Sequence, residues 1–406
     1  MAVSNKDILT FVLAGGRGER LDPLTRDRTK PAVPFGGIFR IIDFTLSNCI
    51  NSGLRKIYVL TQYKSFSLQK HLLAGWDVVS TQLGEFIDII PAQQQISSEW
   101  YRGTADAIYQ NLSAFEEQNP ELILIVAGDH VYKMDYSRLI ETHLKNKADM
   151  TVACSVFPKE DASQFGVVEV SEDNKILGFE EKPKNPKTIP GDDKNILASM
   201  GVYLFNRNAL LDALNKDAQD KKSEHDFGKN VIPNMVADGK NVFVHRFVNN
   251  RGKIQYWRDI GTRDAYYKAN MDLVSENPSF NIYDKDWPLR TYYEPYPPSK
   301  IVGEDCSIVD SIVSGGCVIE SSNLKNSVLS PNVVIHDNAR VENSVIMEGV
   351  VVGANAQIKN AIIDKRVTIP ENTKIGYDVN EDKKRFTLTN SGIVIVAKKS
   401  SLENKE

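Results

Sequence analysis

The stretch ILTFVLAGGRGERL, residues 8–21, places a glycine-rich turn directly after a short apolar run. The apolar run predicts a buried strand, and the glycines let backbone N–H groups approach a polyphosphate without a Cβ clash. Arg20 and Lys30 add positive charge where a pyrophosphate leaving group would develop negative charge. The spacing matches neither the Gly-x-x-x-x-Gly-Lys-Ser/Thr loop nor the Gly-x-Gly-x-x-Gly dinucleotide fingerprint. The stretch therefore predicts a different phosphate-binding turn, at the carboxyl edge of a parallel sheet.

The composition is that of a globular protein with about two or three domains. Of the 406 residues, 41% are hydrophobic and 25% charged, with a net charge of -4. The isoelectric point is near 6.0 and the mean hydropathy is -0.32. This balance argues against a broad nucleic-acid-binding surface. Residues 17–40 nevertheless hold six basic and three acidic side chains, a net of +3, which favours a small anionic ligand.

The cysteines and the lack of a signal or membrane-spanning pattern bear on where the protein is found. Cys49, Cys154, Cys306 and Cys317 form no Cys-x-x-Cys pair, so reduced thiols are expected and a structural zinc site is not. We find no signal-sequence pattern and no apolar run near the roughly 20 residues of a membrane span. We therefore expect a cytoplasmic protein without membrane or nucleic-acid partners.

The first ~260 residues alternate predicted strands and helices, which is typical of a mainly parallel α/β sheet with ligands at its carboxyl edge. The predicted strands are 8–13, 56–61, 122–127 and 150–157, and the predicted helices are 41–52 and 105–118. Residues 284–298 are rich in Pro, Tyr and Trp and are expected to be a linker packed on a domain.

After residue 300 an aliphatic residue recurs in steps of six, six and five, so that each position repeats every 17 residues. The twelve residues are Ile312, Val318, Leu324, Leu329, Ile335, Val341, Ile346, Val352, Ile358, Ile363, Ile369 and Ile375. This period predicts a three-sided coil of parallel strands, with each aliphatic residue pointing inward. Residues 385–396 are expected to cap the last strand edge.

Several polar residues near glycines are candidates for binding a metal ion and a sugar phosphate. Asp129 follows the predicted strand 122–127, and Asp259 lies in a second turn. Two such carboxylates that meet across a cleft would hold one divalent cation. Lys182 precedes a proline, so we expect its backbone to be extended and its side chain to reach a sugar phosphate. Small and polar groups near Gly166, Ser199 and Tyr101 would suit sugar hydroxyls.

Together these motifs resemble those of the sugar-nucleotide pyrophosphorylases and, among them, the bacterial ADP-glucose pyrophosphorylases. The resemblance runs almost end to end, through residues 13–20, 30–33, 39–44, 46–53, 91–94, 100–107, 127–130, 181–183, 198–201, 225–228 and 256–262. It implies an α/β fold in which a Rossmann-like mixed, mostly parallel sheet forms a nucleotidyltransferase domain in residues 1–265. Residues 266–300 would be a linker, and residues 301–406 a left-handed parallel β-helix for oligomerisation and regulation.

The resemblance further implies transfer of AMP from ATP to glucose 1-phosphate, with Mg²⁺ as cofactor. The products would be ADP-glucose, for bacterial glycogen synthesis, and pyrophosphate. A homotetramer regulated by anionic metabolites is expected. The implied roles are catalysis for Arg20, Lys30 and Asp129; ATP binding for Leu13, Gly15, Gly16, Gln62 and Gly103; glucose 1-phosphate binding for Tyr101, Gly166, Glu181, Lys182 and Ser199; metal binding for Asp129 and Asp259; and effector binding for Arg28, Arg40 and Arg385.

The chain departs from the family at the effector pocket, where Asp27, Pro34 and Glu117 stand in place of basic residues. A carboxylate repels an anion, so bisphosphate activation and the usual AMP site are not expected, whereas another anionic effector is. Three alternatives remain: a sister enzyme with another nucleotide or sugar phosphate, a non-catalytic regulatory subunit, and an acyltransferase site in the coil. For the last, His336 is the histidine near a coil corner.

Overall fold

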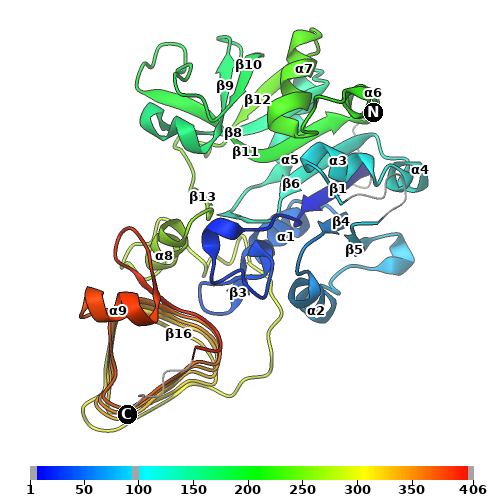
Figure 1. The fold of residues 1–406 in the computed structure, drawn as a ribbon. Helices are drawn as coiled ribbons and strands as arrows, with labels where there is room; N and C mark the ends of the chain where they lie inside the picture. The colour runs from blue at the N-terminus through cyan, green and yellow to red at the C-terminus, as the bar shows by residue number, and fades with distance from the viewer. Residues whose placement is uncertain (1–6, 94–99, 401–406) are drawn as a thin grey trace.

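The fold joins an α/β domain to a coil that is triangular in outline (Figure 1). A computed structural model describes residues 7–93 and 100–400. The expected mixed sheet is confirmed and has nine strands. They are β1 Ile8–Leu13, β4 Lys56–Thr61, β5 Phe86–Pro91, β6 Leu122–Ala127, β8 Met150–Pro158, β9 Gly166–Val170, β10 Ile176–Glu181, β11 Asn195–Asn206 and β12 Val242–Arg246.

The parallel pairs that hold the glycine-rich turn lie in one half of the sheet. There β1 pairs in parallel with β4 and β6, and β4 pairs in parallel with β5. In the other half, β11 runs antiparallel to β6, β8 and β9. The carboxyl ends of β1, β4 and β6 therefore meet at one edge, where a ligand is expected.

Helices cover both faces of the sheet because the central strands are apolar at nearly every position and so present an apolar surface on each face. Leu9 and Phe11 pack with α3, α4, α6 and α7, whereas Ile8 and Val12 pack with α1, α2 and α5. The helices are α1 Ile41–Asn51, α2 Phe66–Gly75, α3 Thr104–Tyr109, α4 Ser113–Gln118, α5 Tyr136–Lys145, α6 Arg207–Gln219, α7 Ile232–Ala237, α8 Arg263–Met271 and α9 Val379–Arg385. No helix in the described ranges is long and apolar enough to cross a membrane.

The single helix predicted over 105–118 is wrong, because the structure has two short helices there, α3 and α4. Side chains explain the break. The Asn111 amide donates to the carbonyl of Ala107 at 2.7 Å and to the Tyr101 hydroxyl at 2.9 Å. Such local bonds compete with the helical pattern.

The predicted three-sided coil is confirmed as a left-handed parallel β-helix of short strands. Three stacked corner residues, Asn338, Asn355 and Asn372, have φ of 59°, 59° and 60°, a conformation that asparagine tolerates. The strands are β14 Lys300–Val302, β15 Ser307–Val309, β16 Ile312–Val313, β17 Val318–Glu320, β18 Asn323–Lys325, β19 Val328–Leu329, β20 Val334–Ile335, β21 Arg340–Ile346, β22 Val351–Val352, β23 Gln357–Ile363, β24 Thr368–Ile369 and β25 Lys374–Ile375.

The predicted inward residues are right from Leu324 onward and wrong before it. The ten from Leu324 to Ile375 lie in the buried core of the coil. In the first turn, however, Val313 pairs with Leu329 and Ile319 with Ile335. The paired residues of the first and second turns are thus 16 residues apart rather than 17. Because successive side chains of a strand point to opposite faces, a shift of one residue turns each predicted inward side chain to the other face. Ile312 and Val318 are therefore only partly buried.

The predicted cap at residues 385–396 is confirmed. Strand β27, Val394–Val396, pairs in parallel with β23. Strand β26, Thr387–Leu388, pairs with β27 in antiparallel fashion. These strands cover the edge of the last turn, which would otherwise present unpaired backbone groups.

A shared apolar core joins the two parts of the chain. Phe35 and Tyr266 from the first part pack in one cluster with Val345 and Ile362 of the coil. The Tyr267 hydroxyl donates to the carbonyl of Asn343 at 2.7 Å. Helix α8 thus crosses the predicted domain boundary at residue 265 and packs on both sides, while the division itself stays a prediction.

The segment before the coil packs on the α/β domain through a buried carboxylate. Asp43 lies at the start of α1 and is fully buried. It accepts hydrogen bonds from Thr291 Oγ1 at 2.7 Å and Trp76 Nε1 at 2.9 Å, and it lies 2.6 Å from His71 Nε2. These contacts hold α2 and the linker against α1.

Candidate active site

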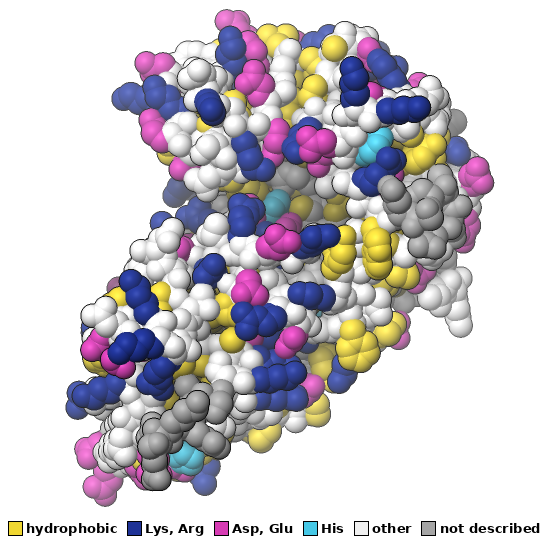
Figure 2. Space-filling view, viewed as in Figure 1, with side chains coloured by type: hydrophobic (Ala, Val, Ile, Leu, Met, Phe, Trp, Pro, Cys, Tyr) yellow, Lys and Arg dark blue, Asp and Glu magenta, His cyan; other side chains and the backbone are white. Residues whose placement is uncertain are grey.

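A cleft of about 790 Å³ opens at the carboxyl edge of the parallel strands. Figure 2 shows the surface hollowed beside the part of the domain that carries β9 to β12, with basic and acidic side chains along the rim. The cleft is lined by nine of the predicted site residues: Leu13, Gly15, Gly16, Arg20, Lys30, Gln62, Tyr101, Gly103 and Asp129. The structure thus brings together residues from five separate segments.

The glycine-rich turn approaches the cleft with its backbone. Gly18 has φ +63°, and a Cβ there would lie 3.1 Å from both Lys30 Cβ and Thr25 Cγ2, so a side chain would be strained as well as crowded. The hydroxyl of Thr25 donates to the Gly18 carbonyl at 2.8 Å. The turn is therefore fixed next to Lys30, and Gly15, Gly16 and Gly18 line the cleft.

Lys30 bridges the two aspartates that the sequence predicts to meet. Its Nζ lies 2.8 Å from Asp129 Oδ2 and 2.8 Å from Asp259 Oδ1, although Lys30 and Asp259 are 229 residues apart. Burial lowers the pKa of Lys30, but the two carboxylates outweigh burial and raise that pKa above its ordinary value. Burial likewise opposes ionisation of Asp129, yet the charges of Lys30 and then His130 hold the pKa of Asp129 at about 2. Lys30 and Asp129 are therefore both charged near neutral pH.

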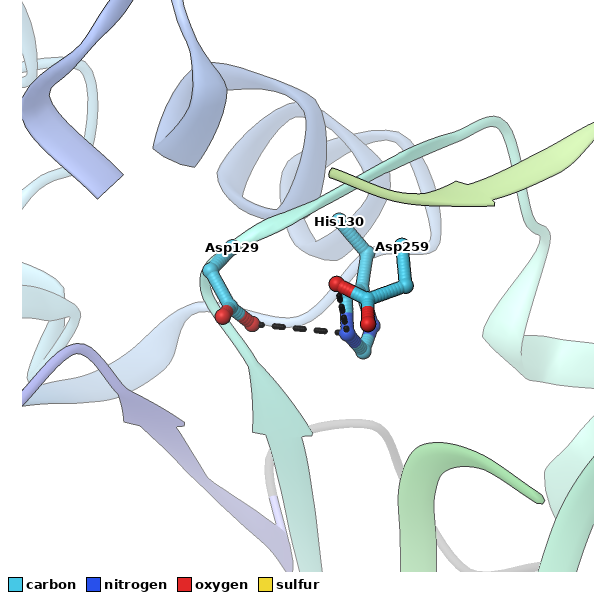
Figure 3. Close-up of side chains that lie close together, drawn as sticks. All are labelled: Asp129, His130 and Asp259. Carbon is cyan, nitrogen blue, oxygen red and sulfur yellow. Dashed lines mark ion pairs between the residues drawn. The ribbon is translucent and has the colours of Figure 1, made fainter. Parts of the chain in front are cut away.

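His130 is a third member of this cluster and was not among the predicted site residues. Its Nε2 lies 3.5 Å from Asp129 Oδ1 and 3.7 Å from Asp259 Oδ1 (Figure 3). Strand β7, His130–Tyr132, carries it and pairs antiparallel with β13, Trp257–Asp259, so the pairing of these two short strands creates the cluster. The sequence signal was the histidine directly after Asp129.

The cluster fits a divalent cation. One ligand atom from each of Asp129, His130 and Asp259 lies within 4.8 Å of the others. Carboxylate oxygens are the donors that hard divalent cations prefer, and such cations usually keep some ligand positions for water or phosphate. In the structure, the Lys30 ammonium supplies positive charge to the same two carboxylates.

Four predicted sugar-phosphate residues lie outside the cleft lining and group around β10 and β11. Glu181 ends β10, and a Cβ on Gly166 would lie 2.9 Å from its Oε2, so the structure brings these two together. Lys182 Nζ lies 2.8 Å from Glu181 Oε1. Ser199 Oγ donates to the Tyr203 hydroxyl at 3.3 Å, where a bulge interrupts the pairing of β11 with β8.

The extended backbone expected at Lys182 is wrong, since its φ is +53°. The Lys182 N–H donates to the carbonyl of Phe165 at 2.9 Å. This bond turns the chain out of β10 at the point where the sheet ends, and tertiary pairing has overridden the local preference before proline.

Thr104 and Asp226 also line the cleft, although neither was among the predicted site residues. The Thr104 hydroxyl donates to Asp226 Oδ2 at 2.9 Å and accepts from the Phe227 N–H at 3.0 Å. Both residues lie inside the blocks that carry the family resemblance, so the signal was present but not assigned.

A second cavity of about 410 Å³ lies between the α/β domain and the coil. It is lined by six basic residues, Arg28, Arg40, Lys70, Lys365, Arg366 and Lys398, and by three acidic ones, Asp27, Glu294 and Glu348. Two of the three predicted effector residues, Arg28 and Arg40, are therefore brought together. Arg385 is not, because it lies on α9 over the ring of Phe386 at 4.8 Å and does not line this cavity.

Arg28 and Arg40 are largely occupied within the protein. Arg28 Nη2 donates to both oxygens of Asp364, each at 2.8 Å, and both side chains are buried. Arg40 Nη1 donates to Ser67 Oγ at 2.8 Å, and burial lowers the pKa of Arg40. On the coil side of the cavity, Lys365 and Arg366 both pair with Glu348, and Arg366 is the more exposed of the two.

Comparison with known proteins agrees with both parts of the fold. Residues 9–276 match the family model described as nucleotidyl transferase, and residues 297–396 match that described as GlmU-like, C-terminal hexapeptide. A glucose-1-phosphate adenylyltransferase 2 of Alkalilimnicola ehrlichii is 49% identical over 96% of this chain and 93% of its own. The glucose-1-phosphate adenylyltransferase of Koribacter versatilis is 47% identical over 98% and 96% of the two chains. The Vibrio cholerae glucose-1-phosphate adenylyltransferase 2 is 45% identical over 96% and 98%.

The fold and the acidic, glycine-lined cleft are those of a nucleotidyl transferase that carries a hexapeptide-repeat coil. The similarity extends through the α/β domain, the linker and the coil. The chain belongs to the glucose-1-phosphate adenylyltransferase family.

Proposed function

We propose that this chain transfers AMP from ATP to glucose 1-phosphate and so forms ADP-glucose and pyrophosphate, for glycogen synthesis in a bacterial cytoplasm. The observation that carries the proposal is the meeting of Asp129, Asp259 and Lys30 beside the glycine-rich turn, with 2.8 Å from Lys30 Nζ to each carboxylate. The choice of substrates rests on the name shared by relatives 45–49% identical over nearly the whole chain.

Nucleotidyl transferases of this family use a divalent metal, and Asp129 and Asp259 are the residues that would hold it, with His130 beside them. We take the metal to be Mg²⁺. When bound, it supplies positive charge that stabilises the phosphate oxygens of ATP.

In the reaction, an oxygen of glucose 1-phosphate forms a bond to the α-phosphorus of ATP, and the bond from that phosphorus to the bridging oxygen of pyrophosphate breaks. The attacking oxygen is already anionic, so no general base is needed. Two like charges about 4 Å apart repel by about 4 kcal/mol at an effective dielectric of 20. Bringing the two substrates together therefore depends on the cationic side chains of the cleft.

We assign the following roles to this chain's residues, and the lining of the cleft supports those on the nucleotide side. Arg20 and Lys30 would neutralise the β- and γ-phosphates, while the backbone of Leu13, Gly15, Gly16 and Gly103, together with Gln62, would hold the nucleotide. Lys182 would bind the phosphate of glucose 1-phosphate once it leaves Glu181, its partner at 2.8 Å. Tyr101, Gly166, Glu181 and Ser199 would orient the glucose.

The test is pyrophosphate release from ATP, UTP, dTTP and GTP, each with Mg²⁺ and glucose 1-phosphate. We expect turnover with ATP far above that with the others. Preference for another nucleotide would assign the chain to a sister activity, and no turnover in a folded sample would favour a regulatory subunit. An Asp259→Asn variant serves as the matched control, since it is nearly isosteric and should lose turnover while staying folded.

The cavity between the domains is the effector site in this proposal, and the coil builds a homotetramer. Arg28 and Arg40 from the first part and Lys365, Arg366 and Lys398 from the coil support the binding of an anion there. Asp27, which also lines the cavity, opposes a second phosphate group.

Effector binding is tested by measuring the ADP-glucose-forming activity of the wild type and of Arg366→Ala. Each is assayed with sugar phosphates, nucleotides and short carboxylates added in turn as candidate effectors. Lys383→Ala, on α9 away from the cavity lining, is the control. We expect an effector response that Arg366→Ala weakens and Lys383→Ala keeps, and no activation by fructose 1,6-bisphosphate. Light scattering of the same samples tests the tetramer.

A further inference from the structure

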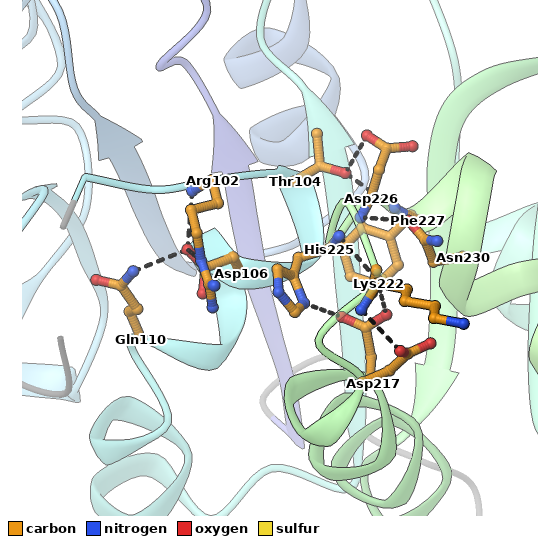
Figure 4. Close-up of polar contacts among 12 residues, drawn as sticks. Arg102, Thr104, Asp106, Gln110, Asp217, Lys222, His225, Asp226, Phe227 and Asn230 are labelled. Atoms are coloured by element: carbon orange, nitrogen blue, oxygen red, sulfur yellow. Dashed lines mark hydrogen bonds and ion pairs between the residues drawn. The ribbon is translucent and has the colours of Figure 1, made fainter.

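A buried histidine–aspartate pair lies behind the cleft, outside the machinery described above. Asp217, in the last turn of α6, and His225 are each only 4% exposed. Asp217 Oδ2 lies 2.8 Å from His225 Nδ1, and Asp217 Oδ1 accepts from Ser223 Oγ at 2.6 Å (Figure 4). Ser223 Oγ in turn accepts from the His225 N–H at 2.9 Å. These contacts form a closed ring that fixes both the imidazole and the backbone of His225.

The backbone of His225 is held where few residues are stable. Its φ is +53°, a left-handed conformation that costs a non-glycine residue free energy unless the surroundings impose it. Its carbonyl accepts from the N–H groups of Ala105 at 2.8 Å and Asp106 at 3.2 Å, and so completes the first turn of α3. A Cβ on Gly103 would lie 2.2 Å from this carbonyl oxygen, so the two segments touch directly.

The turn that starts at His225 connects the two sides of the cleft. Asp226 Oδ1 accepts from the Gly228 and Lys229 N–H groups, at 2.9 and 3.1 Å, while its Oδ2 accepts from Thr104. A Cβ on Gly228 would lie 3.1 Å from Glu181 Oε2. The turn therefore lies against Gly103 and Thr104 on one side and against Glu181 on the other.

We infer that Asp217 and His225 act as a positioning pair, which sets the turn 225–228 and thereby the distance between the nucleotide-side segment 103–104 and the sugar-side Glu181. His225 acts through Asp226, Gly228 and the α3 backbone and touches no substrate itself. The inference rests on the proposed function, because it assigns glucose 1-phosphate to the Glu181 side of the cleft. Loss of the pair should misplace Glu181 and, of the residues proposed to hold the nucleotide, Gly103. Leu13, Gly15, Gly16 and Gln62 lie on other segments and should keep their places.

The test compares four variants with the wild type. His225→Ala removes the ring, and Asp217→Asn removes the charge that holds it. His225→Asn keeps an N–H donor and a residue type that tolerates positive φ. His143→Ala is the matched control, because His143 is 1% exposed and hydrogen-bonded to Thr151 and Asn206 but lies on α5, away from the cleft.

In steady-state kinetics, we expect His225→Ala to raise the KM for glucose 1-phosphate about ten-fold and to change the KM for ATP less than about two-fold. His225→Asn should recover most of the loss. His143→Ala should lower stability without changing the ratio of the two KM values. The inference would be overturned if His225→Ala and Asp217→Asn both kept the wild-type ratio of the KM for glucose 1-phosphate to the KM for ATP. It would also be overturned if His143→Ala changed this ratio as much as His225→Ala does.

Amide hydrogen exchange gives a readout that does not need activity. Exchange in residues 104–110 should speed up in Asp217→Asn and His225→Ala and not in His143→Ala. If the wild type fails to make ADP-glucose, the proposed function fails while exchange still tests the positioning. If His225→Ala does not fold, Asp217→Asn and Ser223→Ala carry both measurements, and unchanged exchange in both contradicts the pair's role.

Discussion

Replacing Lys30 by methionine removes the ammonium group that joins Asp129 to Asp259. The Lys30 side chain is 8% exposed, and its Nζ is 2.8 Å from both carboxylates. Breaking a buried ion pair by removing one partner costs about 3–5 kcal/mol, because the remaining charge is left uncompensated. Here the aspartates are 31% and 25% exposed, so water screens them and we expect the lower end, about 3 kcal/mol.

The same geometry predicts how a metal should change this loss. Without Lys30, Asp129 and Asp259 repel each other, and the pKa of Asp129 should rise from about 2. A divalent cation bound between them would replace the missing charge. Added Mg²⁺ should therefore stabilise Lys30→Met more than it stabilises the wild type.

The assay is thermal unfolding with and without Mg²⁺. At about 2 °C per kcal/mol for a domain of this size, Lys30→Met should lower the Tm by about 6 °C in chelator. Mg²⁺ should restore a substantial part of that loss. Lys365→Met is the control, because Lys365 is also largely buried, against Glu348, but lies in the coil; it should lose stability without a larger response to Mg²⁺. An equal Mg²⁺ response in the wild type and Lys30→Met would refute the reasoning.

The other predictions concern the sugar phosphate, pH and the coil. Lys182→Ala should raise the KM for glucose 1-phosphate far more than that for ATP in steady-state assays, and equal effects would contradict its assigned role. Burial lowers the pKa of His245 to about 4, below its unfolded value near 6.5, so this group withdraws stability as pH falls from about 6.5 towards 4. Urea unfolding should show that the free energy of unfolding falls between pH 7.5 and pH 5, and that it falls less in His245→Gln than in the wild type, by about 2 kcal/mol or less. An identical fall in the two proteins would disprove this. Ile358→Ala should cost about 2–5 kcal/mol by opening a cavity in the coil, measured by denaturant unfolding against the partly exposed Gln357→Ala, which should change little.

Local patterns in the sequence were sufficient for the architecture. Strands β1, β4 and β6 begin and end where the apolar runs predict, because a buried parallel strand needs a continuous apolar run ended by a turn. The 17-residue period likewise predicts the coil from Leu324 onward. Both signals depend only on neighbours along the chain or on strict repetition. The one-residue shortening of the first turn of the coil breaks the repetition, and the prediction fails there.

The contacts of the site were decided by tertiary structure. Asp129 and Asp259 are predicted as partners from their chemistry, but His130 beside them follows from the pairing of β7 with β13. Lys30 reaches both carboxylates from a third, separate segment of the chain. Arg28 finds Asp364 across 336 residues, and His225 takes a left-handed backbone because Asp217 and α3 hold it. Such partners are set by how distant segments close on one another. Residue types and their spacing determine which elements form and what chemistry they carry, whereas the distances between charged groups arise only when the whole chain packs.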